Sequence, residues 1–384
     1  MGGIFPRFPG SCDRWLEALP LDGCDLVCEP FAGSASLTVH AHQNGIAHAI
    51  SGETDPSVRV CLALYRIPPL FPVFRRAMIC HQASIRKDPV AAWDIIKQEM
   101  ETLIAGGSRG SISELAAVSH AYRALAYAGI VRSAKSTNKL NVGMGKEQLK
   151  TFPTKDFSNL KIMPDGCSLD VHSDWRGAIA AIPENANAFV LIDPPYYCGP
   201  KKRMEPCYPG HRPRDPETLG LCIDALSAAL AHKGVRRVVM KNYATPELEQ
   251  FLESTPTSWI VIRKVTGQRL VGPGRRGGKH DLGVPNIENF WYFYPDPKRL
   301  KSQGKPLDPE FLQLQKIAAA APSKGWIETG KVTGRNFKQA WWRGQYEGKT
   351  TIYIGRVGSA AYWDARSAQL ARKKLKSYRS VGGH

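Results

Sequence analysis

The chain has 384 residues, of which 43% are hydrophobic, and its formal net charge at pH 7 is +18. This length is more than one ordinary compact core needs, so we expect one large domain with an appendage, or two domains. The charge makes a polyanion such as DNA the expected partner. No apolar run approaches the roughly 18 residues that cross a bilayer, and the start of the sequence lacks a signal-peptide layout. We therefore expect a cytoplasmic protein with no membrane partner.

The cysteines are also typical of an intracellular protein. The nine cysteines contain no CxxC pair and form no cluster with histidine at the spacing of a zinc site. We therefore expect reduced thiols and no metal.

The first elements in chain order form the opening of an α/β unit. Residues 24–45 predict a short strand at 26–28, a turn with a glycine, and a helix. A second strand follows at about 47–51 and ends at Glu53. Residues 66–165 lack strand alternation and contain helical stretches such as 117–136, which predicts a helical insertion.

Strand and helix alternation returns after the insertion. The sequence predicts strands within 165–172 and at 188–192, a helix at 218–234, and further strands at 235–243 and 289–295. The expected fold class is α/β, with a mostly parallel, doubly wound sheet and helices on both faces. We assign residues 1–65 and 166–295 to this domain.

The end of the chain has a different composition. Residues 296–322 begin with a segment rich in Pro, Lys and turn-forming residues and predict a linker. Residues 323–384 hold 13 Lys and Arg against 3 acids and interleave them with aromatic residues, and they predict a small sheet followed by a basic helix. This module suits nucleic-acid binding, although its aromatic residues would equally serve as the core of a small domain.

The most informative motif is Asp193-Pro194-Pro195-Tyr196, directly after the apolar strand at 188–192. Ligands of an open parallel sheet bind beyond the carboxyl ends of its strands. An aspartate and a proline carbonyl held there can accept both hydrogens of an exocyclic amine, while the tyrosine ring stacks on the attached base. A proline turn with a buried tyrosine is the alternative.

A second motif, at 29–35, follows the first predicted strand. Gly33 permits a tight turn and close approach of a ligand to the backbone. Glu53, at the end of the next strand, is placed to bind ribose hydroxyls. Because the loop lacks repeated glycines, the pair favours nucleoside binding over phosphate binding.

These residues resemble the Dam-type (alpha-class) DNA adenine methyltransferases, and the matching motifs run in the family's order over residues 4–295. Glu-Pro-Phe-Ala-Gly-Ser-Ala (29–35) resembles the cofactor loop, residues 173–175 the G-D-F element, and residues 139–145 the end of the target-recognition region, which makes the helical insertion at 66–165 the target-recognition region by analogy. Two departures are Ala35, where the family has a second glycine, and Cys12, where it has a lysine. The resemblance implies S-adenosyl-L-methionine as cofactor, bound by Arg7, Pro9, Gly10, Glu29, Phe31, Gly33, Glu53, Asp174, Trp175 and Asp193.

The resemblance also implies a mechanism. The target adenine would be flipped out of the DNA, its amino group held by Asp193 and the Pro194 carbonyl, and its ring stacked on Tyr196, with no metal needed. The expected DNA-binding residues lie in three basic segments and are Arg132, Lys135, Lys139, Asn141, Lys201, Lys202, Arg203, Arg275 and Arg276. Each of these charges can also be a solvated surface group.

Other functions stay open at this point. The acceptor could be N4 of cytosine or adenine N6 in RNA, because these amino groups are geometrically alike; a protein glutamine amide would more usually go with Asn at position 193. From another class, the chain could be a DNA-binding protein built on a decayed methyltransferase, an alternative based on Ala35 and Cys12.

Overall fold

The computed structural model of the chain divides into two compact units, Met1–Pro195 with Pro206–Val235, and Tyr196–Glu205 with Arg236–His384. The structure describes residues 16, 19–127, 131, 139–157, 160, 162–197, 216–243, 245–253, 259–269, 286–295, 326–331, 338–346 and 349–356. We treat each unit by itself.

The first unit is built on four parallel strands, β1 (Leu26–Glu29), β2 (His48–Gly52), β3 (Ser168–His172) and β4 (Ala188–Ile192), in the order β3-β2-β1-β4. All residues of β1 and β4 are buried, as expected for strands covered on both faces. The chain runs from β1 outward to β2 and β3 and then returns to the other side of β1. The neighbourhood of β1 and β4 is therefore the switch point of the sheet, where ligands of such folds bind.

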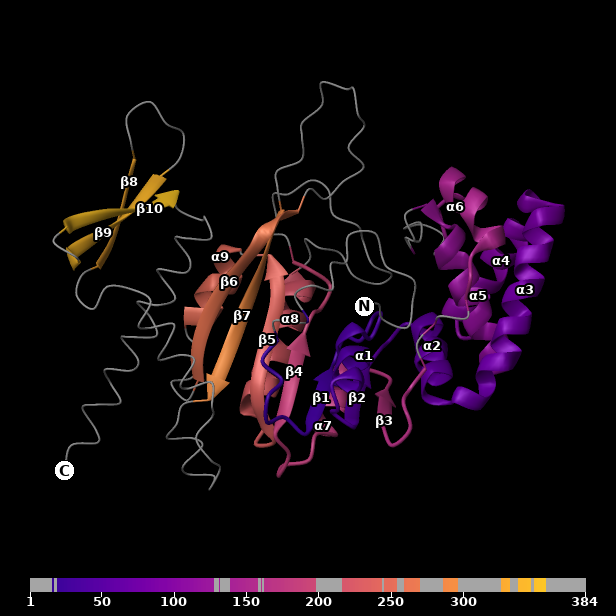
Figure 1. Cartoon of the computed structure of the whole chain (residues 1–384), viewed down its shortest axis with the longest axis horizontal. Helices are drawn as coiled ribbons and strands as arrows, with labels where there is room; N and C mark the ends of the chain where they lie inside the picture. Colours follow the sequence, from indigo (N-terminus) through magenta and orange to yellow (C-terminus); the bar gives the residue numbers. More distant parts are fainter. Residues whose placement is uncertain are drawn as a thin grey trace. The chain divides into compact units, whose positions relative to one another are not determined.

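Short helices pack on these strands (Figure 1). α1 (Ser36–Gln43) contacts β1 and β2, while α7 (Trp175–Ala180) contacts β1, β2 and β3. α8 (Pro216–Ala231) packs on β4 and also contacts α7. The alternation of strand and helix predicted from the sequence is present in this unit.

A helical segment lies between β2 and β3 in the chain. It consists of α2 (Pro56–Arg66), α3 (Phe71–Lys87), α4 (Pro89–Ile104), α5 (Ile112–Leu125) and α6 (Lys146–Thr151), with single turns of 3-10 helix at Pro68–Leu70 and Phe152–Thr154. α5 is its central helix, since it contacts α2, α3 and α4 and buries most of its residues. Three of these helices begin at a side-chain cap, which is Asp55 for α2, Asp88 for α4 and Ser111 for α5.

One predicted helix is shorter than expected. The sequence favours helix through residues 117–136, but α5 ends at Leu125, because Ala126 is extended (φ −59°, ψ 142°) and pairs with Met144 in an antiparallel bridge. The backbone of the following segment continues this pairing, with Tyr127 N donating to Gly143 O at 3.0 Å and Gly145 N to Leu125 O at 2.9 Å. Long-range pairing therefore overrides local helix propensity here.

The second unit contains antiparallel strands. β5 (Val235–Tyr243), β6 (Trp259–Arg269) and β7 (Asn286–Pro295) follow the order β5-β7-β6, and both pairings are antiparallel, with α9 (Pro246–Glu253) between β5 and β6 in the chain. The two expected strands at 235–243 and 289–295 therefore pair with each other in antiparallel fashion, and β6 was not predicted. Antiparallel neighbours need no crossover helix, so the strand and helix alternation of the earlier chain does not extend to them.

A separate three-stranded antiparallel sheet, in the order β10-β9-β8, is formed by β8 (Trp326–Lys331), β9 (Lys338–Tyr346) and β10 (Lys349–Arg356). These strands fall in the segment 323–384 for which the sequence predicts a small sheet. The expected linker at 296–322 and the basic helix lie outside the described residues, and the predicted domain boundaries stay predictions.

Among the described residues, no single helix has both the length and the apolar character needed to span a membrane; Pro56–Arg66 and Pro68–Lys87 meet that standard only as a pair bent by 106°.

Candidate cofactor and catalytic site

Glu29 is a buried carboxylate at the end of β1 that caps a helix. Its Oε1 accepts a hydrogen bond from Leu37 N at 3.1 Å, and its Oε2 accepts from Thr38 N at 2.8 Å and Thr38 Oγ1 at 2.7 Å. These donors belong to the first turn of α1, where a negative charge complements the helix dipole. Burial nevertheless raises the pKa of Glu29 to about 7, against the lowering effect of its donors, and the nearby charge of Asp193 raises it further. Glu29 therefore fixes the loop from inside through its hydrogen bonds to α1.

The loop between Glu29 and α1 turns through two residues with positive φ. Gly33 has φ +49°, and a Cβ placed on it would meet no atom within 4 Å, so a ligand can approach its backbone. Ala35, directly before α1, has φ 51° and ψ 39°, a left-handed conformation that glycine adopts at lower cost. Among the described residues it is the only non-glycine residue with positive φ. The position where the family has its second glycine thus keeps the glycine-like conformation in this chain.

Three loops at the carboxyl ends of β1, β2 and β3 meet at Gly52. A Cβ on Gly52 would lie 2.6 Å from Pro30 O and 2.7 Å from Asp174 O, so only glycine fits between these two backbones. Ala32 N donates to Gly52 O at 2.9 Å, and Glu53 N donates to the carbonyl of His172 at 3.0 Å. The loops are therefore fixed relative to one another by the backbone.

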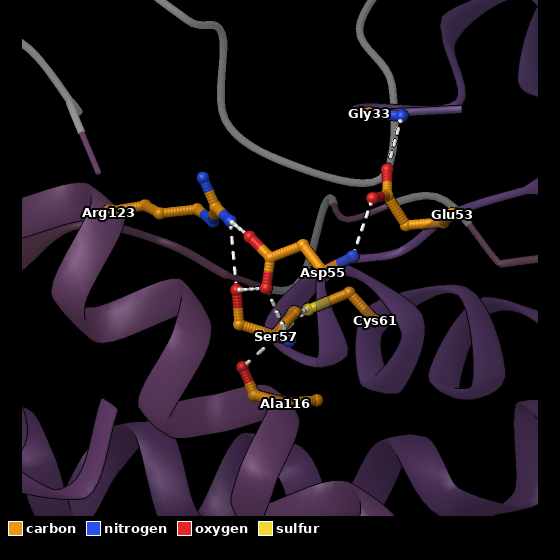
Figure 2. Close-up of polar contacts among 7 residues, drawn as sticks. All are labelled: Gly33, Glu53, Asp55, Ser57, Cys61, Ala116 and Arg123. Atoms are coloured by element: carbon orange, nitrogen blue, oxygen red, sulfur yellow. Dashed lines mark hydrogen bonds and ion pairs between the residues drawn. The ribbon is translucent and has the colours of Figure 1, made fainter. Parts of the chain in front are cut away.

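Glu53 joins the first two loops through its carboxylate (Figure 2). Oε2 accepts from Gly33 N at 3.0 Å, and Oε1 accepts from Asp55 N at 2.8 Å. Burial raises the pKa of Glu53, whereas these two donors and the positive charge of Arg123 lower it. Each carboxylate oxygen can accept more than one hydrogen bond, so Glu53 keeps capacity for the hydroxyls of a ribose.

Asp174 and Trp175 form the third loop and the start of α7. Asp174 caps α7 through Oδ1, which accepts from Gly177 N at 2.7 Å. Trp175 is buried, and its indole Nε1 has no hydrogen-bond partner among the described residues. The guanidinium of Arg176 lies over its ring, with Cζ 4.3 Å from the ring centroid. A buried N–H donor of this kind is suited to an acceptor on a bound ligand.

The predicted catalytic motif follows β4. Asp193, Pro194 and Pro195 belong to the first unit, where Pro194 is buried, Asp193 is partly exposed, and the carbonyl of Pro195 accepts a weak hydrogen bond from Cys222 Sγ of α8 at 3.8 Å. Because β4 pairs with β1 in parallel, Asp193 and Glu29 end neighbouring strands at the same edge of the sheet. This edge also carries the loops that follow β2 and β3.

Tyr196 belongs to the second unit and packs against residues of β5. Its ring meets that of Tyr243 edge to face, with centroids 4.8 Å apart, and Lys241 Nζ lies 5.4 Å from its centroid. A cation over an aromatic face is attracted to it. Nothing in the sequence indicated that Lys241 and Tyr243 accompany the motif, since they follow it by more than forty positions.

A nucleoside cofactor fits the residues of the first unit. Gly33 leaves open space at the backbone, Glu53 keeps acceptor capacity, and the buried Trp175 Nε1 needs an acceptor. Phe31, also predicted to contact the cofactor, is partly exposed in the same loop. No group of three metal-ligating side chains occurs in the part of the chain that the structure describes.

Of the predicted DNA-binding residues, two are described. Lys139 and Asn141 are exposed, whereas their neighbours Leu140 and Val142 are buried, so this segment alternates and presents polar side chains outward. The predicted residues that lie outside the described part are Arg7, Pro9, Gly10, Arg132, Lys135, Lys201, Lys202, Arg203, Arg275 and Arg276.

Comparison with known proteins gives little further guidance. No protein-family model and no curated protein matches the chain. Among solved structures, a "conserved hypothetical protein" from Streptococcus pyogenes is 12% identical, with 71% of this chain and 86% of that chain covered and a TM-score of 0.24. A "putative RNA methyltransferase" from Pyrococcus horikoshii is also 12% identical, with 70% and 74% covered and a TM-score of 0.27. Likenesses this distant carry no argument about activity, which has to be argued from the site itself.

Proposed function

We propose that this chain is an S-adenosylmethionine-dependent methyltransferase that methylates N6 of adenine in DNA. The observation that carries the proposal is the position of Asp193, which directly follows the strand that pairs with the strand of Glu29. The charge of Asp193 also raises the pKa of Glu29. An aspartate with the following prolines thus adjoins loops that suit a nucleoside. This is the arrangement that transfer from a nucleoside cofactor to an exocyclic amine requires.

The cofactor half of the proposal depends on three acids with different tasks. Glu29 is committed to α1 and shapes the loop, and Glu53 offers acceptor capacity for ribose hydroxyls. Asp174 uses Oδ1 for the helix cap, and its Oδ2 accepts no hydrogen bond within the described part of the chain. The remaining oxygen of Asp174 is suited to the exocyclic amine of the cofactor's adenine. S-adenosylmethionine, when bound there, supplies an electrophilic methyl group on a sulfonium.

The acceptor half depends on the motif. An amine nitrogen attacks well only when its lone pair is freed from the ring, and two acceptors on its hydrogens favour that state. Asp193 and the Pro194 carbonyl are these acceptors in our proposal, and Tyr196 stacks on the base. Transfer would form the N–C bond, break the S–C bond to leave S-adenosylhomocysteine, and release one proton of the amine to solvent. Alignment of the two reactants is the main contribution to the rate.

DNA is the proposed acceptor because the chain carries a net charge of +18 and presents polar residues such as Lys139 and Asn141 at the surface of the helical segment. RNA adenine and cytosine N4 share the relevant chemistry. Ala35 adopts the left-handed conformation that glycine favours, which supports an intact cofactor loop over a decayed one.

The experiment is transfer of labelled methyl from S-adenosylmethionine to unmethylated DNA, to RNA and to a protein mixture, with Asp193→Ala as the comparison, followed by nucleoside analysis. N6-methyladenine in DNA, produced only by the wild type, supports the proposal. N4-methylcytosine in DNA would make cytosine the acceptor in place of adenine. Label found in RNA alone or in protein alone would make that polymer the acceptor in place of DNA. A wild type that binds no cofactor contradicts the methyltransferase itself.

A further inference from the structure

Arg123 is a charged side chain in an unusual place. It belongs to the last turn of α5, in the middle of the helical segment, and is only 8% exposed. Burial of a guanidinium is costly unless its charge is matched, and an apolar side chain of similar size would pack two helices at least as well. The burial of Arg123 is therefore better explained by its polar contacts than by helix packing alone.

The contacts of Arg123 lead to the N-terminus of α2 (Figure 2). Its Nη2 lies 3.4 Å from Asp55 Oδ2 and donates to Ser57 Oγ at 3.0 Å. Asp55 Oδ1 in turn accepts from Ser57 N at 2.8 Å and from Ser57 Oγ at 2.7 Å, which caps α2. Cys61 Sγ, one turn further along α2, lies 4.0 Å from Ala116 O and reinforces the contact of the two helices. Asp55 is therefore held from both sides.

Asp55 also holds the candidate ribose acid. Its backbone N–H donates to Glu53 Oε1 at 2.8 Å, and the other oxygen of Glu53 accepts from Gly33 at 3.0 Å. The orientation of the Glu53 carboxylate thus depends on where the backbone of residue 55 lies. That backbone position is set by the cap on α2 and by the ion pair to α5.

We infer that Asp55 and Arg123 are positioning residues, which hold the Glu53 carboxylate in the orientation that receives the ribose hydroxyls of the cofactor. The inference rests on the proposed function, because it takes Glu53 as the ribose-binding acid. The charge of Arg123 acts in the same direction, since it lowers the pKa of Glu53 against the effects of burial and of the Asp55 charge and so favours the form that accepts hydroxyl hydrogens.

The test measures binding of S-adenosylhomocysteine and of its 2′-deoxy counterpart to the full chain by calorimetry. The variants are Arg123→Met, Asp55→Asn and Glu53→Gln. Asp88→Asn is the matched control, because Asp88 also caps a helix before a proline but lies at the exposed start of α4. Asparagine caps helices about as well as aspartate, so Asp55→Asn keeps α2 while it removes the charge.

We expect the wild type to prefer the ribose ligand. Arg123→Met should weaken binding of that ligand about tenfold, in line with loss of a charge-assisted hydrogen bond to the group that holds Glu53, and should change binding of the deoxy ligand little. Asp55→Asn, which keeps the helix cap and the backbone N–H and loses only the ion pair, should weaken binding of the ribose ligand in the same direction but by less. Asp88→Asn should match the wild type. Arg123→Met added to Glu53→Gln should cause no further loss of the preference, and Arg123→Lys should restore part of it.

Two results would overturn the inference alone. The first is that Arg123→Met and Asp55→Asn both keep the full wild-type preference for the ribose ligand. The second is that the affinities for the ribose and the deoxy ligand fall equally, which marks a purely structural role. Absence of binding of either ligand to the wild type would instead overturn the proposed function, and the inference with it.

Discussion

Glu29→Gln should change how the stability of the protein depends on pH. In the folded chain the Glu29 carboxyl has a pKa of about 7, against an ordinary value of 4.5. A folded state that binds its proton more tightly gains stability at low pH and loses it as pH rises through the folded pKa. From the two pKa values, and about 1.4 kcal/mol per unit, Glu29 should contribute about 3 kcal/mol at pH 4.5 that is gone by about pH 8.

Glutamine does not titrate, so its variant lacks this contribution at every pH. The deficit of Glu29→Gln relative to the wild type should therefore be about 3 kcal/mol larger at pH 4.5 than at about pH 8. On top of this comes a pH-independent cost, because the amide nitrogen cannot accept from Leu37 N or Thr38 N as the carboxylate oxygens do.

The assay is urea unfolding followed by far-ultraviolet circular dichroism over this pH range, with Glu184→Gln as the same substitution at an exposed site. Asp193→Asn should reduce the pH dependence in an otherwise wild-type chain, because the charge of Asp193 helps to raise the pKa of Glu29. A deficit of Glu29→Gln that is the same at all pH values would refute the reasoning. A deficit that grows with pH would refute its sign.

Three further predictions test the site. Gly52→Ala should destabilise the chain by about 3 kcal/mol or more and abolish cofactor binding, because its methyl would meet two backbone carbonyl oxygens at 2.6 and 2.7 Å. Its control is Gly220→Ala, which has open space in α8 and should stabilise the chain by about 0.5 to 1 kcal/mol. Urea midpoints of the two variants that shift in the same direction would contradict this. Ala35→Gly should change the free energy of unfolding by less than about 1 kcal/mol. Ala35→Val should cost about 1 to 3 kcal/mol, because Ala35 is buried and a β-branched residue tolerates positive φ poorly. Equal effects of the two substitutions in thermal melts would argue against strain at this position. Lys241→Gln should slow methyl transfer several-fold, since it removes the cation over Tyr196, without changing cofactor affinity, and an unchanged rate would assign Lys241 no part in placing the ring.

The strands that carry the site could be predicted because their residues are continuously apolar. β4 and β5 have the predicted bounds, and β1 and β2 differ from theirs by about one residue at either end. β6 was not predicted, although Ile260, Val261 and Ile262 are β-branched and apolar, because the alternation of strand and helix does not extend to this antiparallel strand. The end of α5 could not be predicted either, because a backbone pairing with residues 143–145 decides it.

The site could be predicted less completely than the sheet. Motif spacing selected Glu29, Glu53 and Asp193 as candidate site residues, and the structure has each of them at or directly after the end of a strand. It did not distinguish the structural task of Glu29, whose carboxylate is used by α1. Arg123 lies 68 positions from Asp55, and the pairing depends on how α5 packs against α2, which no local pattern encodes. Local motifs thus identify the acids, while tertiary packing determines what holds them.

We propose that Asp193 acts on the acceptor amine, beside loops that would bind the cofactor. The most direct test of this claim compares wild type with Asp193→Asn in two measurements on the same preparations: the affinity for S-adenosylmethionine, and the rate of N6-methyladenine formation in DNA when both substrates are saturating. We predict that the variant keeps its cofactor affinity within a few-fold and loses transfer by about a hundredfold or more, as when a positioned acceptor of the reacting group is removed. Transfer at the wild-type rate, or a loss fully explained by weaker cofactor binding, would contradict the account.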